Sequence, residues 1–220
     1  LLAYRQLGEY DGLREKGDSK VMLDKIHEVF EPFTTAQTKI RYDLLAVVSK
    51  NYNAESEAIV ELSNVSFLMG EDYVHKMPND LHFLNILALT YTVQGKSSND
   101  TKLLLKGEEY FKKLLLISPN KLDFSYGLAL NWMYQKRYIE SINLFEKVFD
   151  AHPKFFSLGT ELESIYTVFI KHFYEVKDKD NFIRVSKRLK ENNYSDSSSL
   201  EKIIDFIQKN NFWPNINFYE

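Results

Sequence analysis

The segment PNKLDFSYGLALNWMYQKRYIESINLFEKVFDAHP, Pro119–Pro153, carries the clearest structural signal in the chain. The two prolines that bound it are 34 residues apart. Between them, the small residues Ala129 and Ser141 are spaced so that two helices could pack closely, and Trp132 and Phe145 could fill the gap between them. This pattern predicts a helical hairpin.

The segment that ends at Pro119 has a related pattern. Its first helix is predicted over LHFLNILALTYTVQG, Leu81–Gly95, with Ala88 as the small residue, and Gly107 is the small residue of the second helix. These two residues are 19 apart, whereas Ala129 and Ser141 are 12 apart. Because Gly95–Lys102 is polar and rich in turn-forming residues, we expect the extra residues to form a long loop there.

Helical periodicity extends on both sides of these two segments. We expect further helices at about residues 18–30, 38–52, 55–76, 158–176, 179–192 and 198–210, the last with a capping box made by Ser198 and Glu201. No stretch reads convincingly as a strand. The sequence therefore predicts an all-α chain of about nine helices.

The 34-residue period and this order of small and aromatic positions resemble the tetratricopeptide repeat, closely over 120–153 and loosely over about 40–210. Ser125 and Val148 depart from the repeat's usual residues. The resemblance implies a solenoid of antiparallel helical hairpins, a right-handed superhelix with one concave face. We expect an N-terminal helical segment or linker over 1–36, the repeat domain over 37–210 and an irregular tail over 211–220.

Composition and motifs argue against several classes of function. The chain has no cysteine, which excludes disulfides and thiolate chemistry, and its net charge of −3 argues against sequence-independent nucleic-acid binding. No apolar run is long enough to span a membrane, and no phosphate-binding glycine motif or nucleophile elbow occurs. His172 and Glu175 are one helical turn apart, but a single pair reads better as a surface ion pair than as a metal site. We therefore expect no catalytic residue, no cofactor and no metal.

The concave face of such a solenoid is the better candidate for a site, because an aromatic and methionine-lined groove suits an extended peptide or a partner helix. The residues expected to face it are Asn85, Leu89, Asp123, Tyr126, Leu130, Met133 and Tyr134, with His82 and Thr92 beside them. The alternative, that a neighbouring helix covers Tyr126, Leu130 and Met133, is equally open at this point. Some tetratricopeptide domains clamp the terminal carboxylate of a partner. At the matching positions this chain has Asp123, Tyr126 and Gly127, which do not form such a clamp.

A narrower resemblance concerns the order of features along the chain. FEPFTTAQTKIRYDLLAVV (Phe30–Val48), MPNDLHFLNILALTYTVQG (Met77–Gly95) and the segment Leu103–Pro153 follow one another as in the soluble C-terminal region of bacterial O-antigen ligase/polymerase-like membrane proteins. The resemblance implies a tail that follows a membrane part, and the start at Leu1 favours a piece of a longer protein. None of that family's sugar-transfer residues is carried over, because they lie outside such a tail.

Two functions follow as hypotheses. The first is a non-catalytic interaction or scaffold domain, tethered to a membrane by a segment outside this chain, whose groove holds a protein partner or a neighbouring subunit. The second is a freestanding cytoplasmic tetratricopeptide adaptor or regulator.

Overall fold

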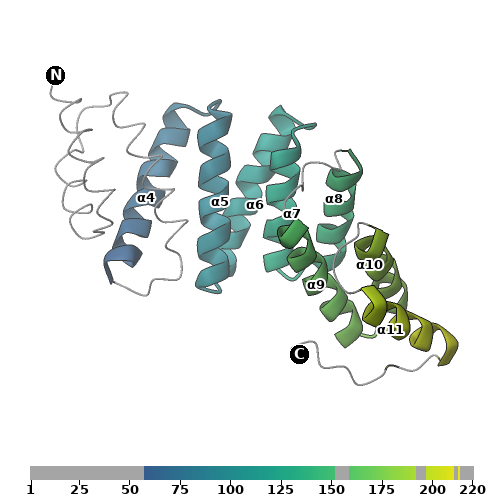
Figure 1. Ribbon diagram of the computed structural model, residues 1–220. Helices are drawn as coiled ribbons and strands as arrows, with labels where there is room; N and C mark the ends of the chain where they lie inside the picture. The colour runs from purple at the N-terminus through teal and green to yellow at the C-terminus, as the bar shows by residue number, and fades with distance from the viewer. Residues whose placement is uncertain (1–56, 152–158, 192–196, 211–212, 214–220) are drawn as a thin grey trace. The chain divides into compact units, whose positions relative to one another are not determined.

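The computed structural model describes residues 57–151, 159–191, 197–210 and 213. These residues form eight helices and no strand, so the all-α prediction is confirmed for this part of the chain (Figure 1). The expected helices before residue 57 and the segment 1–36 lie outside what the structure describes. Ser198 and Glu201 lie within a described helix, but the side chains of the expected capping box are outside the description. The helices are α4 (Glu57–Lys76), α5 (Leu81–Ser97), α6 (Thr101–Ile117), α7 (Leu122–Tyr134), α8 (Tyr138–Ala151), α9 (Gly159–Glu175), α10 (Lys179–Glu191) and α11 (Ser197–Asn210).

The connection between α5 and α6 is short, and the expectation of a long loop over Gly95–Lys102 is wrong. Only residues 98–100 separate the two helices. Asn99 adopts a left-handed backbone with φ 52°, and the Asp100 side chain caps α6 by accepting a hydrogen bond from the Lys102 amide. The extra residues therefore lengthen the two helices, because Gly95 remains helical and buried against Leu104.

Helices α5 and α6 run antiparallel. Gly95, near the end of α5, lies against Leu104 near the start of α6, whereas Gly107, further along α6, lies against Ala88, earlier in α5. A Cβ atom on Gly107 would lie 3.0 Å from the Ala88 carbonyl oxygen, so glycine permits the close approach that the sequence predicts.

Helix α7 returns alongside α6 and also packs against α5. Gly127 faces the ring of Phe111, and the Asn131 Nδ2 atom donates to Thr92 Oγ1 at 2.7 Å and to the Leu104 carbonyl at 3.0 Å. One buried amide thus links three helices. Ala129 is fully buried as expected, and its carbonyl accepts a hydrogen bond from Ser141 Oγ on α8.

The chain divides into two compact units, residues 1–145 and 146–220, and the boundary falls inside α8. The core of the first unit is built from α4, α5, α6 and α7. Its most buried side chains include Phe83, Leu84, Leu87, Phe111, Leu114 and Leu128. In these described residues, no helix has both the length and the apolar character that crossing a membrane requires.

The second unit contains the aromatic helix that the sequence predicts. Helix α9 packs against α10, and α10 against α11. The large apolar and aromatic residues along one side of α9 are buried: Ile165, Tyr166, Phe169, Ile170, Phe173 and Tyr174. Of the predicted tail 211–220, the structure describes Trp213, whose ring meets those of Tyr174 and Phe182 edge to face.

Candidate partner-binding groove

Helices α5 and α7 lie side by side in the same direction, because each is antiparallel to α6. The hydrogen bond between Asn131 and Thr92 joins residues 39 positions apart. The groove predicted from the sequence would lie along these two helices.

A cavity of about 310 Å³ opens at the N-terminal ends of these two helices. It lies between the first turns of α5 and α7 and the joint that precedes α7. Two of the residues predicted from the sequence, Asn85 and Asp123, share this cavity, and His82 lies in it as well. The complete lining is Leu81, His82, Asn85, Ser118, Lys121, Asp123 and Phe124.

The polar atoms of this cavity differ in how well they are paired. The Asp123 carboxylate lies 3.5 Å from the Lys121 ammonium, and both side chains are about half exposed, so the pair contributes little to stability. The Oδ1 atom of Asn85, in contrast, is buried and has no hydrogen-bond partner. A buried acceptor left in this state costs about 1–3 kcal/mol.

The other predicted groove residues differ in how far their side chains are exposed. Leu89 and Leu130 are half-buried, and Tyr126, also half-buried, packs edge to face on Phe145. Tyr134 lies under the ammonium group of Lys96, 5.0 Å from the ring centre. Met133 is only 7% exposed, which leaves little of its side chain for a partner. Contact between the remaining side chains and a partner stays a prediction.

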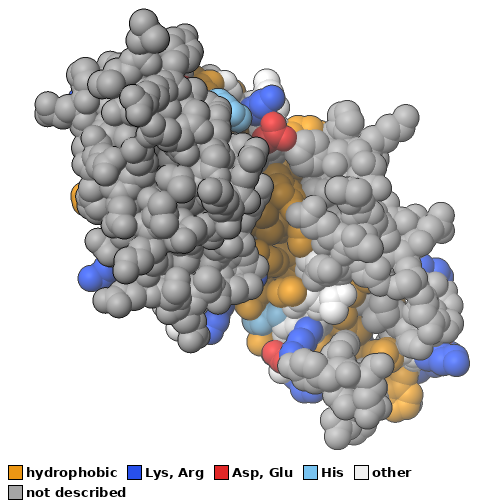
Figure 2. All heavy atoms as spheres, turned by 60° about the vertical axis from the view of Figure 1, so that its left-hand side comes forward, with side chains coloured by type: hydrophobic (Ala, Val, Ile, Leu, Met, Phe, Trp, Pro, Cys, Tyr) orange, Lys and Arg blue, Asp and Glu red, His pale blue; other side chains and the backbone are white. Residues whose placement is uncertain are grey.

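Large hydrophobic side chains are also exposed elsewhere, and Figure 2 shows hydrophobic side chains gathered on one face. Leu116 on α6 is 85% exposed and Leu68 on α4 is 72% exposed. They lie on different helices from the cavity residues and provide comparison positions for the groove.

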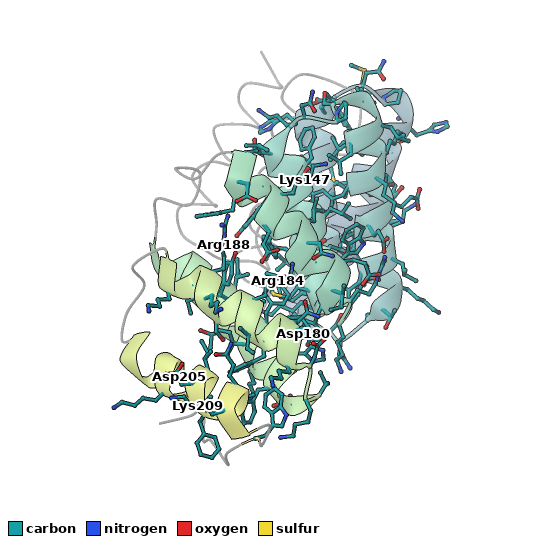
Figure 3. The ribbon with its side chains drawn as sticks, turned by 90° about the vertical axis from the view of Figure 1, so that its right-hand side faces the viewer. Lys147, Asp180, Arg184, Arg188, Asp205 and Lys209 are labelled. Atoms are coloured by element: carbon teal, nitrogen blue, oxygen red, sulfur yellow. The ribbon has the colours of Figure 1, made fainter. Side chains whose placement is uncertain are left out.

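A second hollow, of about 330 Å³, lies in the second unit and is lined only by charged residues. Arg184 Nη1 donates to Glu146 Oε2 at 2.7 Å, and Arg188 pairs with Asp150 one turn further along both helices. Figure 3 shows the two arginines following one another along α10. Burial raises the pKa of Glu146, although Arg184 and Arg188 oppose that effect. The two ion pairs join α8 to α10, and Lys187 completes the lining.

The most elaborate polar cluster was not anticipated from the sequence. Glu108 of α6 is 4% exposed and accepts hydrogen bonds from Trp132 Nε1, Gln135 Nε2 and Arg137 Nη1 at 2.8 to 3.0 Å, and from Lys112 Nζ at 2.7 Å. Burial disfavours the carboxylate, but these four donors outweigh burial and hold the pKa of Glu108 at about 2. Because three of these four donors come from α7 and the turn that follows it, the cluster links α6 to the end of α7.

His172 and the acidic residues of the described part of the chain do not converge on a metal site. His172 is half-buried, and its pKa is lowered because burial disfavours the charged imidazolium more than Glu175 and Asp178 favour it. Among the residues that the structure covers, no three His, Asp or Glu side chains are grouped closely enough to hold a metal ion.

No family model, no curated protein and no solved structure matches this chain. Any inference about function therefore rests on the arrangement of the described residues.

Proposed function

We propose that this chain is a protein-interaction scaffold built from tetratricopeptide-like hairpins, and that the groove between α5 and α7 holds an extended segment of a protein partner. The observation that carries the proposal is the cavity shared by Asn85 and Asp123, with a buried acceptor that lacks a donor. Leu89, Tyr126 and Leu130 continue from it as half-buried apolar positions on the same two helices. This mixture of polar ends and apolar surface suits an extended peptide.

A near-constant separation between bonded residues supports the repeat. Asn131 bonds to Thr92 and Tyr110 bonds to Glu71, each across 39 positions. In the second unit, Arg184 bonds to Glu146 and Arg188 to Asp150, each across 38 positions. Helices two apart in the chain therefore meet in the same register within each unit, as expected when similar hairpins are stacked.

The groove is tested by selecting binders from a displayed library of random short peptides and measuring their affinity by fluorescence anisotropy. We expect Leu89→Ala on α5 and Tyr126→Ala on α7 each to weaken the selected peptides roughly fivefold or more, because truncating a central contact residue typically costs over 1 kcal/mol. Leu116→Ala, at an exposed leucine of α6, is the matched control and should leave affinity unchanged.

Circular dichroism of each variant checks that the helices remain folded. Selected peptides that bind Leu89→Ala and Tyr126→Ala as tightly as the unaltered chain would overturn the groove assignment. Met133→Ala is unsuitable as a probe of direct contact, since Met133 is buried and its truncation would disturb packing as well.

The attachment of this domain to a membrane glycan ligase or polymerase remains a prediction from the resemblance. The full coding sequence tests it directly. Several apolar spans upstream of Leu1 would support the tethered scaffold. A starting methionine immediately before Leu1 would support the freestanding adaptor instead.

A further inference from the structure

We infer that the cavity at the N-terminal ends of α5 and α7 receives an arginine or lysine side chain of the bound segment. This inference rests on the proposed function and specifies the partner's chemistry at one point of the groove. It comes from three features of the cavity: an acceptor that needs a donor, an exchangeable carboxylate and an apolar wall.

The acceptor is Asn85 Oδ1, which is buried without a hydrogen-bond partner. The terminal torsion of an asparagine side chain is soft, so the carboxamide can turn its oxygen towards the cavity at low cost. Turning breaks no hydrogen bond of that oxygen, because it makes none. A donor that enters the cavity would therefore remove the cost of the unsatisfied acceptor.

The carboxylate is that of Asp123, on the opposite side of the cavity from α5. It is paired with Lys121 at 3.5 Å, and the two side chains are 47% and 58% exposed. A solvent-exposed pair of this length is worth little, so a cation from the partner can compete with Lys121 for the carboxylate. A charge-assisted bond to an incoming guanidinium would be shorter and stronger than the existing contact.

The apolar wall is provided by Leu81 and Phe124. Arginine and lysine both carry a long methylene stem that packs on such surfaces while the charged head reaches polar groups. The volume of about 310 Å³ accommodates one such side chain with water around it. An acidic side chain fits less well, because the Asp123 carboxylate would repel it and it would have to compete with that carboxylate for Lys121.

The test is a titration of the isotope-labelled chain with acetyl-arginine amide, followed by amide resonances in NMR spectra. We expect saturable shifts at the Asn85 side-chain amide and at the backbone amides of residues 81–85 and 118–124. Acetyl-norleucine amide, which keeps an apolar stem, and acetyl-glutamate amide are the comparison ligands. Each should bind roughly fivefold more weakly or worse.

Two variants separate the contributions of the cavity residues. Asn85→Leu removes the acceptor, and Asp123→Asn removes the charge; each should weaken acetyl-arginine amide roughly fivefold. Asp72→Asn is the matched control, because Asp72 is also an exposed aspartate paired with a lysine, Lys76, but lies on α4. It should not change the affinity.

Equal binding of norleucine and arginine amides, tighter binding of the glutamate amide, or shifts located elsewhere would overturn this inference. The peptide selection distinguishes it from the proposed function. Selected peptides without arginine or lysine that still depend on Leu89 would overturn the inference and leave the groove standing. Peptides indifferent to Leu89→Ala would overturn the groove itself, whatever their charge.

Discussion

Glu108 shows how one buried charge can be favourable when several donors surround it. Its carboxylate binds four donors, of which Trp132, Gln135 and Arg137 come from α7 and the turn that follows it. The guanidinium of Arg137 also lies over the Trp132 ring, 4.9 Å from its centre. Removal of the charge would therefore loosen several side chains at once.

Acid should weaken the fold through Glu108. Its pKa of about 2 in the folded chain lies below the ordinary value of 4.5, so the folded state binds the proton less readily than the unfolded state. The stabilisation is complete above about pH 4.5 and is lost as the pH falls towards about 2. We expect a loss on the order of 2–3 kcal/mol, measured by urea unfolding at a series of pH values.

The variant Glu108→Gln isolates this contribution. It should be less stable than the unaltered chain at about pH 6, and the difference should shrink as the pH falls towards about 2, where about half of the Glu108 carboxylate is protonated in the folded chain. A stability difference that does not change with pH would show that the carboxylate's charge is not what the four donors stabilise.

At the scale of elements, the Pro119–Pro153 segment predicted its own helices well. Ala129 and Gly107 are buried where helices approach, as their small side chains indicate. The α5–α6 connection was mispredicted, because composition favours a loop there while the Asp100 cap and the contact of Gly95 with Leu104 extend the helices. Such a contact joins residues on two different helices, and local composition carries no signal of it.

The candidate site was predictable to the extent that helical periodicity defines a face. Asn85 and Asp123 were both predicted to face the groove, and they line one cavity at the N-terminal ends of α5 and α7. Their contact with a partner stays a prediction. The burial of Met133 depends on neighbouring helices, which periodicity of α7 alone does not describe. The donors to Glu108 are spread from Lys112 to Arg137, so no local motif announces that cluster.

Trp213 should stabilise the packing of α9 against α10. Its ring lies edge to face on Tyr174 and Phe182, and the Lys177 ammonium lies over both the Tyr174 and Trp213 rings. Because Trp213 is half-buried, we expect Trp213→Ala to cost about 1–3 kcal/mol, less than loss of a core aromatic residue. Thermal unfolding followed by circular dichroism measures the effect.

Phe206→Ala is the comparison for Trp213→Ala, since Phe206 is an aromatic residue of α11 that is 41% exposed. Its truncation should lower the unfolding temperature less. Equal shifts for the two variants would mean that Trp213 contributes only generic apolar contact and that its ring contacts with Tyr174 and Phe182 add nothing specific.

At the scale of the whole molecule, the boundary between the two compact units lies within one continuous helix. Residues 138–145 of α8 belong to the first unit and residues 146–151 to the second. A helix is cooperative over short distances, so loosening one part of α8 affects the rest. In the second unit, Glu146 and Asp150 of α8 hold Arg184 and Arg188 of α10. A disturbance of α8 should therefore reach α10.

Phe145→Ala tests this coupling, because Phe145 is 1% exposed and is the last residue of the first unit. The cavity should cost about 3–5 kcal/mol. We expect hydrogen exchange to accelerate throughout α8 and in α10, because Glu146 and Asp150 of α8 pair with Arg184 and Arg188 of α10, and less in α4. Phe206→Ala is again the control and should leave exchange in α8 unchanged. Acceleration confined to residues 138–145 would show instead that the two units open independently despite the shared helix.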